Sequence, residues 1–87
     1  MANVTDQQTK RFELAAYAIV ETLVESNDVV REGPLYAALM SQGFSLSDFQ
    51  KVLVPIIVHS GLAVRTPSFG LTATDKGRAM VQAVRTA

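Results

Sequence analysis

The segment FSLSDF at residues 44–49 constrains the fold more than any other part of this chain. Ser45, followed three residues later by Asp48, has the spacing of a capping box, in which each side chain accepts a hydrogen bond from the backbone N–H of the other residue. Phe44 and Phe49 flank this pair at the positions of a hydrophobic staple. The pattern predicts that a helix begins just after Ser45, close to the end of the preceding helix.

Apolar residues recur at helical spacing from this start as far as Ser60, and Gly61 is typical of a helix end. On a regular helix the inward face would be Leu46, Phe49, Val52, Leu53, Ile56 and Ile57. The outward side would be Ser47, Lys51, Val54, Pro55 and Val58. Pro55 lies inside this helix, where it lacks an amide hydrogen and crowds the preceding turn, so we expect a kink there.

Local signals predict the other elements in the same way. A first helix over 6–26 has apolar residues on one face and ends at Asn27. A very short strand at 29–31 precedes a helix that starts at Pro34 and ends at Gly43, which gives a helix-turn-helix over 34–60. A hairpin over 62–73 and a last helix over 75–85, capped by Thr74, complete the chain. We therefore expect one domain over 1–87 of the α+β class, mainly helical, with about four helices.

Composition argues against catalysis and against metal or cofactor chemistry. The 87 residues include no cysteine and one histidine, so a thiol nucleophile and a multi-histidine metal site are excluded. His59 is expected near the end of its helix in a structural role, and the carboxylates of Glu21 and Glu25 on a solvated helix face. We expect no enzyme and no cofactor.

The ends and the apolar runs indicate a cytoplasmic chain. No basic segment precedes an apolar one at the N-terminus, so a secretory signal is not expected. The longest apolar runs, Leu14–Val20 and Val52–Val58, are far shorter than the roughly 20 residues that span a bilayer. The sequence predicts no membrane partner.

The order helix, short strand, helix, turn, helix, hairpin, helix resembles a winged helix-turn-helix domain. SGLAVR at 60–65 looks like the entry to the wing, and TDKGRAM at 74–80 is similar to the LTxKGR segment after the wing of bacterial MarR-type and PadR-type regulators. The resemblance covers roughly residues 29–80. It implies a transcription regulator that binds duplex DNA as a homodimer, with the third helix in the major groove. The positions it implies for DNA contact include Ser47, Gln50 and Lys51 on that helix and Arg65 on the wing.

The charge distribution extends this expectation. Net charge is zero, but residues 1–50 hold three basic residues against seven acidic ones, whereas residues 51–87 hold five against one. If Lys51, Arg65, Lys76 and Arg78 share a face, they form a modest surface for phosphate contacts. An alternative is that these charges only solvate helix surfaces.

Two sets of apolar residues point to protein contacts. Leu14, Tyr17 and Val24 lie outside the main apolar face of the first helix, so either a second copy or the last helix of the same chain covers them. Val54 and Val58, on the expected outward side of the third helix, suggest an alternative function. In that alternative the chain is a winged-helix protein-interaction module that does not bind DNA.

Overall fold

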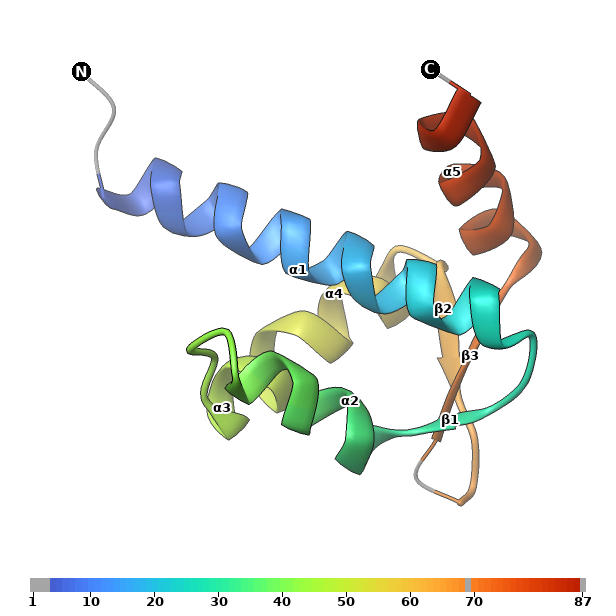
Figure 1. The fold of residues 1–87 in the computed structure, drawn as a ribbon, viewed down its shortest axis with the longest axis horizontal. Helices are drawn as coiled ribbons and strands as arrows, with labels where there is room; N and C mark the ends of the chain where they lie inside the picture. The colour runs from blue at the N-terminus through green and yellow to red at the C-terminus, as the bar shows by residue number, and fades with distance from the viewer. Residues whose placement is uncertain (1–3, 69, 87) are drawn as a thin grey trace.

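The computed structural model describes residues 4–68 and 70–86, and they form an α+β fold that is mainly helical (Figure 1). In chain order the elements are α1 (Val4–Ser26), β1 (Val30–Arg31), α2 (Glu32–Met40), α3 (Leu46–Asp48), η1 (Phe49–Leu53), α4 (Val54–His59), β2 (Ala63–Arg65), β3 (Gly70–Ala73) and α5 (Asp75–Thr86). The element order agrees with the sequence prediction. Several boundaries differ by one to a few residues: α1 begins at Val4, β1 at Val30, α2 at Glu32 and β2 at Ala63, whereas α4 ends at His59 and α5 at Thr86.

The sheet has three antiparallel strands in the order β1-β3-β2. The predicted hairpin is β2–β3, with Ala63 opposite Ala73 and Arg65 opposite Leu71. The predicted short strand is β1, which pairs with the other edge of β3 through Val30 and Leu71. Since α2 follows β1 directly, this pairing brings the start of α2 beside the hairpin. Position 69 of the predicted wing lies outside the described residues.

Helix α1 crosses the molecule and covers its core. It packs on η1, α4, β3 and α5 through a buried face that includes Ile19, Val20 and Leu23, at the helical spacing predicted from the sequence. The largest fully buried side chains of the core are Phe49, Leu23, Leu53, Ile57, Leu71, Val20, Val54 and Val81. The N-terminal part of α1 extends past the body of the molecule, and the C-terminal part of α5 rises away from α1 (Figure 1). Among the described residues, no helix combines the length and the apolar character needed to cross a membrane.

Two glycines end helices in the predicted way. After α2, the N–H of Phe44 donates to the carbonyl of Leu39 and the N–H of Gly43 to that of Met40, which is the Schellman pattern. The same pattern recurs after α4 around Gly61. Gly43 (φ 93°) and Gly61 (φ 78°) supply the left-handed conformation that the motif requires. These turns set the directions in which the chain leaves α2 and α4.

The predicted capping box starts α3. The Ser45 hydroxyl accepts from the N–H of Asp48 at 3.0 Å, and the Asp48 carboxylate accepts from the N–H of Ser45 at 3.1 Å. Phe44 and Phe49 are both buried, with Phe44 against Phe12 and Phe49 against Tyr36. The helical segment therefore begins where the sequence places it.

The interior of that segment is not a regular α-helix. Phe49–Leu53 forms a π-helical turn, closed by a hydrogen bond from the N–H of Val54 to the carbonyl of Phe49, five residues back. The turn adds one residue to the helix, so the buried positions are 49, 53, 54 and 57 instead of the regular 49, 52, 53 and 56. Pro55 follows directly after this turn, in a helix that continues from η1 without a break, and it has no amide hydrogen to donate to the preceding turn. The disturbance expected at Pro55 thus takes the form of a π turn just before it.

The π turn overturns part of the predicted helix faces. Val54 is 1 % exposed, so its expected place on the outward side is wrong. Leu46 and Ile56, expected in the core, are 47 % and 42 % exposed. The errors at Val54 and Ile56 have one cause, because the π turn shifts every later residue by about one position around the helix. Leu46 precedes that turn and is exposed in the first turn of the segment.

Thr74 ties the start of α5 to the end of α4. Its hydroxyl donates to the carbonyl of Gly61 at 2.5 Å and accepts from the N–H of Gly77 at 3.1 Å, so it caps α5 as predicted. The N–H of Thr74 donates to the carbonyl of Leu62. The same carbonyl approaches Gly77 so closely that a Cβ at position 77 would overlap it.

Candidate nucleic-acid interface

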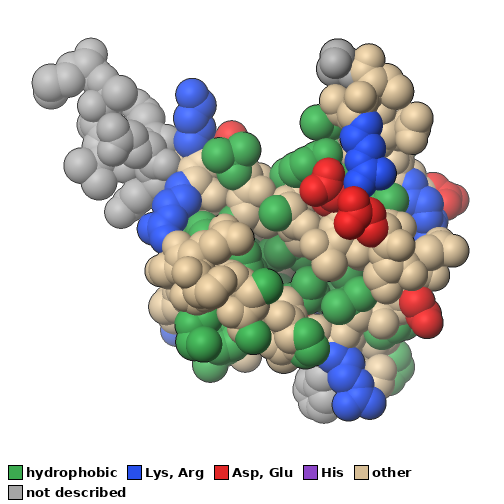
Figure 2. Space-filling view, viewed as in Figure 1, with side chains coloured by type: hydrophobic (Ala, Val, Ile, Leu, Met, Phe, Trp, Pro, Cys, Tyr) green, Lys and Arg blue, Asp and Glu red, His purple; other side chains and the backbone are tan. Residues whose placement is uncertain are grey.

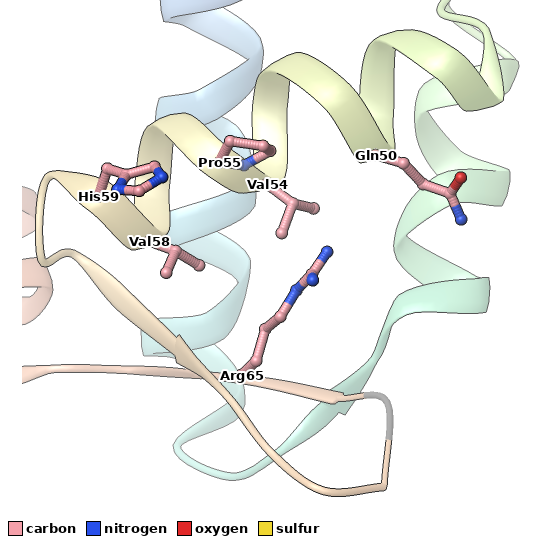
Figure 3. Close-up of a pocket in the computed structure, with 6 residues that line it drawn as sticks. All are labelled: Gln50, Val54, Pro55, Val58, His59 and Arg65. Carbon is pink, nitrogen blue, oxygen red and sulfur yellow. The ribbon is translucent and has the colours of Figure 1, made fainter.

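A pocket of about 160 Å³ lies between the helical segment η1–α4 and strand β2 (Figure 3). We call it the hairpin pocket, and its lining residues are Gln50, Val54, Pro55, Val58, His59 and Arg65. The structure thus brings together Gln50 and Arg65, which the sequence predicted for DNA contact, and Val54 and Val58, which it predicted for protein contact. The valines and the proline form an apolar wall with polar groups around it.

Arg65 extends from β2 toward the helix, with its guanidinium pointing toward Val54 (Figure 3). Its Nη2 lies 3.7 Å from Oε1 of Glu32, the first residue of α2. The Arg65 side chain remains 54 % exposed, whereas that of Glu32 is 17 % exposed. The cation is therefore partly neutralised within the chain but still accessible. Local spacing does not predict Glu32 at this site, because the two residues approach only through the pairing of β1 and β2 with β3.

Ser47, Gln50 and Lys51 are exposed, as the sequence predicted. Gln50 and Lys51 lie within the π turn, and Ser47 lies in the first turn of the segment. Lys51 does not line the hairpin pocket. The structure therefore combines Gln50 with Arg65 and keeps Lys51 as a separate exposed cation on the same helical segment.

Lys76 and Arg78 are exposed on α5, which begins at the end of β3 opposite the hairpin turn. The aliphatic part of Lys76 lies near Gly61, and Arg78 donates to the carboxylate of Asp75 at 3.0 Å. Neither residue lines the hairpin pocket. The structure does not join them to Gln50 and Arg65 in one pocket, and Asp75 offsets the charge of Arg78.

The predicted interface residues have three different environments. Leu14 is 70 % exposed, whereas Tyr17 and Val24 are partly buried against the core. Val54 is buried, and Val58 is partly buried at the hairpin pocket. Leu14 is thus the one of the five with a largely free side chain.

A polar cluster joins α1 to α5 beside Tyr17. The Tyr17 hydroxyl donates to Glu21 at 3.1 Å, and Arg85 of α5 lies 3.5 Å from Glu21 and 2.7 Å from Glu25. Burial of the ring, and the hydrogen bond to Glu21, raise the pKa of Tyr17 above its ordinary value of 10.0. The cluster holds two carboxylates and one guanidinium.

A second pocket, of about 200 Å³, opens beside α1 at the turn between α2 and α3. We call it the α1 hollow, and its lining residues are Arg11, Leu14, Ala15, Ala18, Gln42 and Phe44. Arg11 donates to the carbonyl of Gln42 at 2.9 Å and lies 4.3 Å from the centroid of the Phe44 ring. Ala18 lies outside the main apolar face, as the sequence predicted together with Leu14, whereas Arg11 was not predicted for this site. Their spacing from Leu14, three residues for Arg11 and four for Ala18, puts both on its face of the helix.

No group of three or more potential metal-ligating side chains occurs among residues 4–68 and 70–86. Comparison with models of protein families, with curated proteins and with solved structures gives no significant match to this chain.

Proposed function

We propose that this protein is a winged-helix transcription regulator that binds duplex DNA as a homodimer. The order of its elements supports the proposal. A tight turn at Gly43 joins α2 to the exposed helical segment α3–η1–α4, and the hairpin β2–β3 follows beside that segment. A helix and an adjacent hairpin are the two parts with which winged-helix proteins contact the groove and the backbone.

The hairpin pocket is the observation that carries the proposal. It joins Gln50 from the helix with Arg65 from the hairpin. A glutamine amide pairs with adenine in the major groove, and an arginine guanidinium with guanine or phosphate. Arg65 and the exposed Lys51 supply positive charge on these two elements. Few cations per chain imply weak binding by one copy, so we include two copies in the proposal.

The first test is fluorescence anisotropy of a labelled random duplex titrated with the protein at several salt concentrations below about 50 mM and above it. We expect binding in the micromolar range that weakens steeply as salt rises, because phosphate contacts release counterions. No binding at the lowest salt concentration would overturn the proposal.

Two variants test the assigned residues. Lys51→Ala and Arg65→Ala should each weaken binding to all duplexes. Each should also reduce the steepness of a plot of log affinity against log salt concentration by about 1. The matched control is Lys10→Ala, which removes the same charge from exposed α1. Equal effects of the three changes would mean that Lys51 and Arg65 do not define the site.

One observation favours a second candidate function. The wall of the hairpin pocket, formed by Val54, Pro55 and Val58, is apolar. Such a surface suits a protein segment as well as a nucleic acid. If the protein is folded but does not bind DNA at low salt, that result favours this interaction module. A cytoplasmic location, expected from the sequence, is part of both proposals.

A further inference from the structure

The outer side of α1 carries a regular stripe of exposed and half-exposed residues. Arg11, Leu14, Ala18, Glu21 and Glu25 recur at the spacing of the contact positions of a coiled coil. The stripe lies opposite the buried face that contains Ile19 and Leu23. It is therefore a helix face that the fold of one chain leaves largely uncovered.

The centre of the stripe has both a projection and a hollow. Leu14 projects with 70 % of its surface exposed. Ala18, one turn further along, lines the α1 hollow together with Ala15, and such small side chains let a second helix approach closely. A helix that carries a projection and a hollow one turn apart can pack against an identical helix running the other way.

The two ends of the stripe carry opposite charges (Figure 2). At the N-terminal end, Arg11 is held by a carbonyl and an aromatic ring, both uncharged. At the other end, Glu21 and Glu25 share the single guanidinium of Arg85, so that cluster has an excess negative charge. Antiparallel pairing of two such helices would put the cation of each beside the carboxylates of the other.

We propose that a second copy of this chain packs antiparallel along α1, with Leu14 of each copy against Ala18 of the other. In that register Arg11 lies opposite Glu21 of the second copy. Ala16 is midway between Leu14 and Ala18 along the helix, and it is also midway between Arg11 and Glu21. The contact is two-fold symmetric, as a closed dimer requires, and the same patch serves both copies. The inference rests on the homodimer of the proposed function and names its surface, and self-association is measured without DNA.

The first experiment measures oligomeric state by sedimentation equilibrium. The unaltered chain should have the mass of two chains, and Leu14→Glu should raise the dissociation constant by roughly a hundredfold or more, since the symmetric contact loses two leucines. Met40→Glu is the matched control, because Met40 is an exposed apolar residue on α2. Circular dichroism should show both variants folded. A monomeric unaltered chain, or equal effects of the two substitutions, would overturn the proposal.

The second experiment tests the antiparallel register by charge exchange. Arg11→Glu and Glu21→Lys should each weaken self-association, because every Arg11–Glu21 contact becomes a pair of like charges. Mixing the two variants should restore dimers, since one contact then regains opposite charges and the other is native. A mixture that associates no better than either variant alone would exclude this register. If the monomeric Leu14→Glu variant still binds DNA, loss of the dimer is distinguished from loss of DNA binding, and the two proposals stand or fall separately.

Discussion

Two glycines lie inside helices, and the space around each decides what an added methyl group does. At Gly77, in the first turn of α5, a Cβ would overlap the carbonyl oxygen of Leu62. At Gly33, in the first turn of α2, the space around a Cβ is open for 4 Å. Alanine is the better helix former at both positions by about 1 kcal/mol, so packing alone separates them.

We expect Gly77→Ala to lower the free energy of unfolding by about 1–3 kcal/mol, because the backbone of α5 must move away from Leu62. Gly33→Ala should leave the free energy unchanged or raise it by up to about 1 kcal/mol. Urea denaturation of both variants measures the difference. If Gly77→Ala proves as stable as Gly33→Ala, the close approach of α5 to Leu62 is wrong.

At the scale of single elements, the sequence predicted the ends of helices better than their interiors. The capping box at Ser45 and the turns at Gly43 and Gly61 depend on hydrogen bonds within a few residues, so local pattern is sufficient to find them. The π turn at Phe49–Leu53 comes just before Pro55, which marked a disturbance of the helix, but the local pattern did not contain its form, a one-residue shift of the buried face. The predicted faces were therefore wrong for Val54 and Ile56.

The candidate site divides in the same way. Solvent exposure of Gln50, Lys51 and Arg65 could be predicted from their polarity. The proximity of Gln50 to Arg65, and of Arg65 to Glu32, results from strand pairing between distant parts of the chain. Spacing along the sequence does not report such contacts, so the sequence could name the residues but not the arrangement.

A pair of substitutions tests the register of the π turn. Val54→Glu should lower the free energy of unfolding by at least about 3 kcal/mol and the Tm by more than about 12 °C, because it places a carboxylate in the core. Ile56→Glu should cost within about 1 kcal/mol, since Ile56 is already partly exposed. Thermal unfolding followed by circular dichroism measures both. A regular helix predicts the reverse order.

At the scale of the whole molecule, α5 is held against the rest of the chain at two levels. The bonds of Thr74 and the buried Val81 fix its first part, and the polar cluster of Tyr17, Glu21, Glu25 and Arg85 holds its last turns. The ion pairs are exposed and contribute little free energy at physiological salt. The hydrogen-bonded phenol of Tyr17 adds a dependence on pH.

The raised pKa of Tyr17 means that the folded chain favours the neutral phenol. Its contribution to stability is complete below the unfolded pKa, near 10, and is lost as pH rises through the folded pKa. We therefore expect the free energy of unfolding to fall more steeply above about pH 10 in the unaltered chain than in Tyr17→Phe. Urea unfolding at a series of alkaline pH values tests this. The control, Tyr36→Phe, keeps Tyr17 and should therefore keep the contribution of Tyr17 to the steep fall. Identical slopes in all three chains would contradict a role of Tyr17 in the alkaline loss of stability.

The extra residue in the π turn has a consequence for alignment with other chains. In a relative whose helix is regular, the core residues equivalent to Phe49 and Leu53 would be separated by one residue fewer. An ungapped alignment would then superpose either the capping box and Phe49 or the residues from Leu53 onward, but never both. Detection of such relatives therefore requires a one-residue gap in the middle of a helix. Gaps are ordinarily penalised most at such positions.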